Sequence, residues 1–238
     1  MTALKTPERT SRRKELRQNF LVDLYARALL LYEERRRLVQ GLGVAVLVLI
    51  LAIPGYIYYH QQQEQVANQK LGQILPVYEQ DNFQQALDGT NNQAGLLTIA
   101  EDYSNTEAGN LATFYSANAL YQLEEYDRAL TYFERFEKGQ DFLGASAYAA
   151  QAAIYENKGS YDRAAGLYEQ AASQYKNKLT APRYLLSAGQ AYEEAGQFQA
   201  AVDVYQRIQD EYPDSNQATA AERYMARAQV RQGKASSS

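Results

Sequence analysis

The chain of 238 residues has no cysteine and a single histidine, His60. Without cysteine there can be no disulfide framework, no thiolate metal site and no lipoprotein-type lipid anchor. A Ser-His-Asp triad and a zinc site both need histidines that the rest of the chain does not supply. The glycines stand singly, so no phosphate-binding loop is present. We therefore expect a chain that is not an enzyme and that holds no metal or cofactor.

Positive charge is concentrated at one end of the chain. Residues 1–37 contain ten Lys or Arg and five Asp or Glu, whereas the whole chain has a net charge of −4. The first segment is therefore about +5, which leaves about −9 for residues 38–238. A domain this acidic repels nucleic acid. We expect proteins as its partners, and neither nucleic acid nor a small-molecule substrate.

Residues 41–59 read GLGVAVLVLILAIPGYIYY and contain no charged side chain. Roughly 20 apolar residues cross a bilayer core as one helix, so we predict a single transmembrane helix over residues 38–60. Basic residues stay in the cytoplasm and tyrosines favour the membrane interface, which predicts a cytoplasmic N-terminus and a domain outside the cytoplasm. The expected interface residues are Arg35, Arg36, Arg37, Tyr56, Tyr58 and Tyr59. A cleaved signal peptide is the alternative, but its charged region would be about 40 residues long and no small-residue cleavage site follows.

Residues 12–38 show the spacing of an amphipathic helix, with Leu16, Phe20 and Leu24 on one face. We assign residues 1–37 to a basic cytoplasmic segment that contains this helix, after a disordered start over residues 1–11. Two interpretations stay open for the helix. It either leads into the membrane as an ordinary cytoplasmic helix, or it lies on the anionic inner leaflet or on a membrane partner.

Beyond a glutamine-rich helical extension over residues 61–75, the chain repeats a helix-turn-helix pattern with a period of about 34 to 37 residues. Three units align well, with second helices that start at Tyr126, Tyr161 and Phe198. A degenerate earlier unit contains Val77, Phe83 and Ala86, and its second helix is expected at about residues 92–103. A final helix over about residues 215–232 has the pattern of a terminal cap, and residues 233–238 are expected to form a disordered tail.

Small residues explain how the two helices of a repeat can approach each other. Ala152 and Gly189 occupy first helices where a second helix must come close. Gly159 and Gly196 precede the second helices and supply the permissive turn. Pro213 blocks continuation of the last second helix. Tyrosines would fill the space between repeats, with their hydroxyls directed to water or to a partner.

This pattern resembles the tetratricopeptide repeat over about residues 70–230, and we assign the repeat domain to residues 76–232. The resemblance implies an all-α solenoid, here preceded by the amphipathic and transmembrane helices and closed by a C-terminal capping helix. Such a solenoid binds proteins or peptides in a concave groove and has no catalytic apparatus. The groove would be lined by Leu111, Phe114, Asn118, Tyr121 and Gln122, then Ser146, Ala149, Ala153, Glu156 and Asn157, and finally Arg183, Leu186, Gln190, Glu193 and Glu194. The alternative is that Phe114 and Tyr121 are core residues.

The order of parts also resembles a family. The basic N-terminus, spanning helix, extension and repeat domain are similar to the YfgM-type ancillary subunit of the bacterial Sec translocon. The junction from Asp88 to Ala112, which includes Leu96-Leu97-Thr98-Ile99-Ala100, resembles members from the Bacteroidetes in particular. The resemblance implies a bacterial inner-membrane protein whose repeat domain faces the periplasm. It also implies association with the Sec channel and a periplasmic chaperone, and assistance to exported chains.

Three functional hypotheses follow from the sequence. In the first, the chain is a translocon-associated module that binds exported chains or a chaperone. In the second, it is a structural accessory subunit of another inner-membrane complex, held by its first 60 residues. In the third, it is a periplasmic scaffold for envelope assembly.

Overall fold

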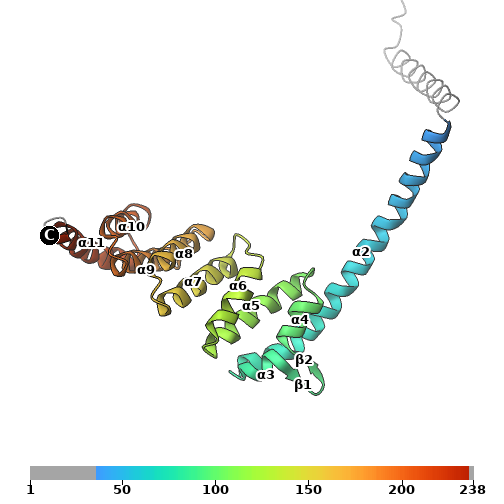
Figure 1. Cartoon of the computed structure of the whole chain (residues 1–238), viewed down its shortest axis with the longest axis horizontal. Coiled ribbons are helices and arrows are strands. Elements are labelled where there is room, and N and C mark those ends of the chain that lie inside the picture. Colours follow the sequence, from blue (N-terminus) through green and yellow to red (C-terminus); the bar gives the residue numbers. More distant parts are fainter. Residues whose placement is uncertain (1–35, 236–238) are drawn as a thin grey trace, which may run out of the picture. The chain divides into compact units, whose positions relative to one another are not determined.

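The structure of the chain, a computed structural model, describes residues 36–235. It divides into two units, residues 1–61 and residues 62–238. The predicted amphipathic helix lies outside the described residues except for its last three positions. The second unit is built almost entirely of helices, which follow one another as antiparallel neighbours (Figure 1).

Helix α2 (Arg36–Glu79) begins in the first unit and ends in the second. In the first unit, its large apolar side chains from Val46 to Tyr59 are 49–69 % exposed. Among the described residues, no helix combines the length and the apolar character that crossing a membrane requires. The structure does not describe the side chains of every residue in the stretch 38–60, so the transmembrane helix stays a prediction.

Three helix pairs occupy the positions of the three aligned repeats. They are α5 (Glu107–Gln122) with α6 (Tyr126–Arg135), α7 (Phe142–Asn157) with α8 (Tyr161–Gln174), and α9 (Ala181–Glu194) with α10 (Phe198–Glu211). Helix α11 (Asn216–Ala235) packs against α10 and α9 and ends the solenoid (Figure 1). Helix α10 ends two residues before Pro213, as the sequence predicts. The described fold is therefore the expected all-α, tetratricopeptide-like solenoid.

The turn inside each pair has one repeated geometry. A residue with positive φ follows the first helix, and these residues are Glu124, Gly159 and Gly196, with φ of 61°, 72° and 76°. The N–H of the next residue then donates to the carbonyl five positions earlier, at 2.8–2.9 Å. This hydrogen bond closes the C-terminus of the first helix in the manner of a Schellman motif. The same bond joins Asn82 to Val77 at 3.3 Å, which shows that the end of α2 belongs to a repeat turn.

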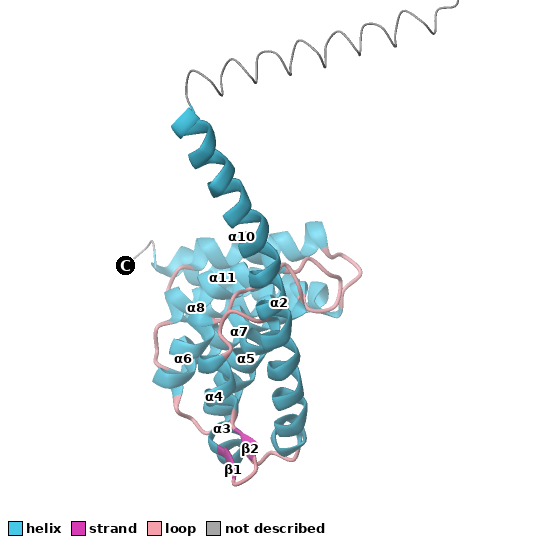
Figure 2. Cartoon of the chain, turned by 90° about the vertical axis from the view of Figure 1, so that its right-hand side faces the viewer, coloured by secondary structure: helices cyan, strands magenta, loops and turns pink. Residues whose placement is uncertain are grey.

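The degenerate first unit differs from the prediction. Its second helix is split into α3 (Phe83–Asp88) and α4 (Leu96–Asp102), with the two-residue strands β1 (Gly89–Thr90) and β2 (Gln93–Ala94) between them. The strands pair as an antiparallel hairpin beside α3 and α4 (Figure 2). The hairpin occupies residues 89–94, so the helix expected from residue 92 begins only at Leu96. A Cβ atom on Gly95 would lie 2.2 Å from the Leu87 carbonyl oxygen, so only glycine fits between the hairpin and α4.

The repeat domain is anchored on the second half of α2. Ala67, Leu71 and Ile74 are buried there in a hydrophobic core that continues as far as α11. The Glu64 carboxylate accepts hydrogen bonds from the backbone N–H groups of Glu107 and Ala108, at 2.7 and 3.1 Å. A carboxylate at a helix N-terminus satisfies otherwise unpaired donors and interacts favourably with the helix dipole. This contact fixes the first turn of α5, the helix that opens the groove described next.

Candidate binding groove

A cavity of about 300 Å³ opens along the first helices of the three repeats. Helices α5, α7 and α9 supply most of its wall, and one residue of α8 forms its floor. Its middle part is lined by alanines of α7, whose small side chains leave the space unfilled. The lining residues are Asn118, Tyr121 and Gln122 of α5, Ala149, Ala150 and Ala153 of α7, Tyr168 of α8, and Arg183, Tyr184 and Ser187 of α9.

The predicted groove residues fall into four groups. Asn118, Tyr121, Gln122 and Arg183 line the cavity, as do Ala149 and Ala153. A second group is partly buried on the same first helices without lining the cavity, and consists of Leu111, Ser146, Glu156, Leu186 and Gln190. A third group, Asn157 and Glu194, is exposed at the ends of α7 and α9. The last group, Phe114 and Glu193, is buried and needs correction.

Phe114 belongs to the core, which was the alternative that the sequence left open. It is 5 % exposed, and its ring lies 5.2 Å from the ring of Phe136 and 6.2 Å from that of Phe133. Tilted and edge-to-face arrangements at these distances stabilise an aromatic cluster. Phe114 therefore holds α5 against the end of α6 and offers no contact to a partner.

Glu193 is buried by contacts that bring α10 and α11 over it. Its side chain is 1 % exposed. The Tyr205 hydroxyl donates to it at 2.9 Å, and the Arg227 guanidinium donates to both of its oxygens at 2.7 and 2.9 Å. A buried carboxylate requires such partners. Glu193 is thus neutralised within the chain and is not available to a ligand.

The predicted membrane-interface residues lie in or before α2. Arg35 falls outside the described residues, and Arg36 is the first residue of the helix. Arg37 is exposed. Tyr56, Tyr58 and Tyr59 are 67 %, 69 % and 61 % exposed. Their role at a membrane stays a prediction.

A tetratricopeptide repeat family model matches residues 116–178 and, in an overlapping match, residues 149–216. The two matches together cover residues 116–216, and this part of the chain has the sequence pattern of tetratricopeptide repeats. Two crystal structures of the kinesin light chain of Podosopora anserina, described as having nearly identical TPR-like repeats, are 17 % identical to it. They align over 73 % of this chain and 87 % and 86 % of their own, with a TM-score of 0.46 in both cases. No curated protein matches the chain.

Tetratricopeptide repeats generally mediate protein–protein interactions and typically form scaffolds without enzymatic activity. In the part of the chain that the structure covers, no group of His, Asp or Glu side chains could hold a metal ion. The cavity along α5, α7 and α9 is therefore a candidate surface for a protein segment. Its mixture of alanine methyl groups, tyrosines and polar side chains suits an extended chain with both apolar and polar residues.

Tyrosine–glutamate hydrogen bonds join the two helices within a repeat, and the sequence analysis missed them. The Tyr168 hydroxyl donates to Glu156 at 2.7 Å, in the same arrangement as Tyr205 and Glu193 one repeat later. Each glutamate is the last but one residue of a first helix, and each tyrosine lies twelve residues further along, in the second helix. This recurrent spacing of glutamate and tyrosine is the signal that could have revealed the pairs. The sequence analysis instead predicted that the tyrosine hydroxyls face water or a partner.

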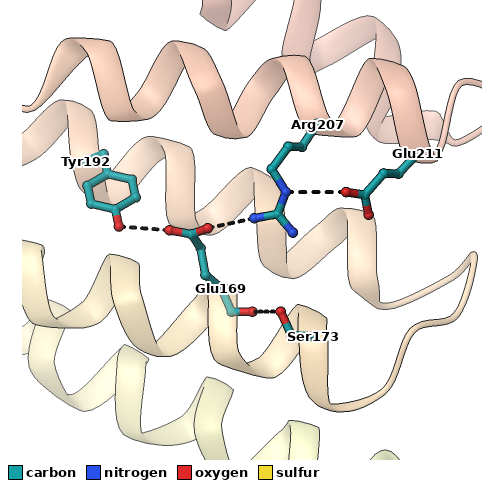
Figure 3. Close-up of polar contacts among 5 residues, drawn as sticks. All are labelled: Glu169, Ser173, Tyr192, Arg207 and Glu211. Carbon is teal, nitrogen blue, oxygen red and sulfur yellow. Dashed lines mark hydrogen bonds and ion pairs between the residues drawn. The ribbon is translucent and has the colours of Figure 1, made fainter.

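A related network joins one repeat to the next. The Tyr192 hydroxyl of α9 donates to Glu169 of α8 at 2.8 Å, and Arg207 of α10 reaches the other Glu169 oxygen at 2.6 Å (Figure 3). Arg207 also lies 3.4 Å from Glu211. Burial and the hydrogen bond to Glu169 raise the pKa of Tyr192 to about 12. The phenol therefore stays protonated well above neutral pH, and its hydrogen bond to Glu169 ties α9 to α8.

Proposed function

We propose that the chain is a membrane-anchored, protein-binding module of the bacterial inner membrane. Its N-terminus lies in the cytoplasm, and its tetratricopeptide domain lies in the periplasm beside the Sec translocon. There it binds segments of exported chains or of a periplasmic chaperone. The observation that carries the proposal is the open cavity across α5, α7 and α9, whose lining includes Asn118, Tyr121 and Arg183.

The apolar half of α2 supports the anchor. Eight aliphatic side chains between Val46 and Ile57 are about half exposed or more in the isolated chain. Fully burying one such side chain stabilises by roughly 1.5–3 kcal/mol. Because each is already partly covered, burying the rest of all eight would contribute about 10 kcal/mol. An exposed apolar surface of this size marks a membrane or protein contact. The basic residues before it favour the bilayer and set the orientation.

The composition of the groove supports the choice of ligand. Carboxylate-clamping grooves of this family place a Lys or Arg four residues before an Asn, whereas here Phe114 precedes Asn118 and Leu186 precedes Gln190. Capture of a C-terminal carboxylate is thus disfavoured. Alanine-lined space with tyrosines at its edge accepts side chains of a passing unfolded chain without demanding one sequence.

Crosslinking in native membranes tests the proposal. After gentle detergent extraction of the tagged full chain, we expect the Sec channel and periplasmic chaperones among the crosslinked proteins. Asn118→Ala combined with Tyr121→Ala should lose a periplasmic partner while the fold is retained. Glu134→Ala combined with Gln170→Ala, on exposed positions of second helices, is the matched control and should bind normally. Full retention of every partner by the folded groove variant would contradict groove binding.

A second candidate function is that of a structural accessory subunit of another inner-membrane complex. The exposed apolar half of α2 favours it, because that surface could contact neighbouring subunits. A chain truncated to begin at Gln61 separates the two functions. The accessory role predicts that the truncated chain no longer joins the complex, whereas groove binding to a periplasmic partner survives the truncation.

A further inference from the structure

The three repeat turns allow positions to be compared from one repeat to the next. Gly196 and Gly233 are 37 residues apart, and Gly233, which lies in the last turn of α11, holds the position that corresponds to Gly196. Counting back nine and six residues from each glycine pairs Ser187 with Tyr224, and Gln190 with Arg227. The first member of each pair belongs to α9 and the second to α11, which occupies the place of a further first helix.

In the last repeat, Tyr224 and Arg227 of α11 cover the hydrogen-bonded pair of Tyr205 and Glu193. The Arg227 guanidinium binds Glu193 at 2.7 and 2.9 Å and lies 4.6 Å from the centre of the Tyr224 ring. The Tyr224 ring in turn lies 5.9 Å from that of Tyr205. An arginine that is both ion-paired and stacked on an aromatic face is held in two ways at once.

One repeat earlier, the same tyrosine–glutamate pair is left open. Tyr168 donates to Glu156 just as Tyr205 donates to Glu193. The residues that should cover the pair are the smaller Ser187 and Gln190, and the cavity lies beside them, with Tyr168 and Ser187 in its wall. Among the ion pairs of the described residues, none involves Glu156. The chain thus contains one filled copy of this site and one unfilled copy.

We propose that the unfilled copy binds an arginine side chain of the partner protein, with Glu156 as its carboxylate and the cavity wall around Tyr168 as its pocket. The inference rests on the proposed protein-binding function and names the chemistry that the groove selects. Arg227 serves as the internal template, because it shows that a guanidinium fits over this pair. Arginine suits the site better than lysine, since its planar fork can bond a carboxylate and stack on a ring.

The charges around the cavity agree with this assignment. Burial, the neighbouring Tyr126 and the Glu156 carboxylate together raise the pKa of Tyr121, which shows that the field of Glu156 reaches the cavity wall. The one cation in the wall, Arg183, precedes Gln190 on α9 by seven residues, or about 10 Å of helix. Arg183 therefore lies about two helical turns away from the position that faces Glu156, where it can meet a carbonyl or carboxylate of the same bound segment.

The first test rebuilds the filled copy at the open position. Gln190→Arg in the full chain should place a guanidinium over Glu156 and raise Tm by at least about 2 °C, the scale of a modest ion-pair gain in a domain of this size. In a Glu156→Gln background, the same substitution should give no gain. A gain of equal size in both backgrounds, or no gain in either, would show that position 190 does not reach Glu156 and would overturn the proposal.

The second test measures binding directly. The full chain in mild detergent, labelled at alanine methyl groups, is titrated with N-acetyl-arginine methylamide and separately with its neutral citrulline analogue. We expect the methyl signals of Ala150 and Ala153 to shift with the arginine compound, and its Kd to be at least about tenfold lower than that of citrulline. Glu156→Gln and Gln190→Arg should each remove this preference, whereas the exposed control Glu222→Gln should keep it.

The outcomes separate the two proposals. Equal or absent binding of the arginine and citrulline compounds overturns the arginine assignment. If the Asn118→Ala and Tyr121→Ala variant still loses its partner in that case, the groove binds protein by other contacts and the proposed function stands. If that variant keeps every partner while the arginine preference is present, the site is real but the crosslinked partners bind elsewhere.

Discussion

The tightest helix–helix contact of the last repeat makes a prediction of definite sign. A Cβ atom on Gly189 would lie 2.3, 2.6 and 2.8 Å from three ring carbons of Tyr205, whereas ordinary contacts lie at 3.4–4 Å. The ring cannot swing aside, because Tyr205 is fully buried and its hydroxyl is bound to Glu193. In Gly189→Ala, overpacking of this kind costs about 1–3 kcal/mol. Replacing a helical glycine by alanine returns at most about 1 kcal/mol.

Contacts this short place the overpacking cost in the upper part of its range, at about 2–3 kcal/mol. After the propensity gain of up to about 1 kcal/mol, we expect Gly189→Ala to lower the free energy of unfolding by about 1–2 kcal/mol. For a domain of this size, that corresponds to a fall in Tm of about 2–8 °C. The matched control is Gly166→Ala in the interior of α8, where the added methyl group would meet no atom within 4 Å. The control should gain up to about 1 kcal/mol and unfold at a higher temperature.

Thermal unfolding of the full chain, followed by far-ultraviolet circular dichroism in one detergent, measures both variants. The same chemical change should shift Tm in opposite directions at the two sites. An increase in Tm for Gly189→Ala would refute the reasoning, because the Tyr205 ring would then be free to move. The preceding repeat indicates how the variant would relax. The corresponding residues there are Ala152 and Tyr168, both buried, so a repeat of this kind can hold an alanine at this position once α9 and α10 adjust.

Three further predictions concern polar contacts. In Tyr192→Phe, the loss of stability between pH 10 and 12 should be smaller than in the parent chain. The pKa of the Tyr192 phenol is about 12 in the folded chain, against 10.0 for the ordinary group. Between these two values the unfolded chain binds fewer protons than the folded chain, so the stability of the parent falls as pH rises. Denaturant titrations at alkaline pH would show the difference between the parent and the variant. Arg227→Ala should destabilise the chain by about 2–3 kcal/mol in urea unfolding, because the buried Glu193 carboxylate loses its main cation. The partial exposure of the Arg227 side chain keeps this loss below that of a fully buried ion pair. Asn110→Ala removes two hydrogen bonds to the loop after α6, at 2.8 and 3.1 Å, and should cost about 1–2 kcal/mol and speed proteolytic nicking of that loop.

The helix pairs could be predicted because their signals are local and repeated. Alanines and tyrosines recur with the helical period, and Gly159 and Gly196 have the positive φ expected of them. Glu124 has the same backbone conformation without being glycine, so only the alignment with the other repeats revealed that turn. The hairpin between α3 and α4 could not be predicted in this way. It depends on a close backbone contact at Gly95, and such a contact leaves no periodic pattern in the sequence.

Individual groove residues were harder to predict than helices, and the reason is the position of the cap. A solenoid needs a terminal helix that closes its core with a polar outer face, and α11 does so with Arg227 over Glu193. A consensus for first helices treats every repeat alike, so it placed Glu193 in the groove together with Glu156. The two carboxylates differ in what the following helix carries, arginine in α11 and glutamine in α9. The open site therefore lies one repeat before α11, the helix that supplies its own arginine.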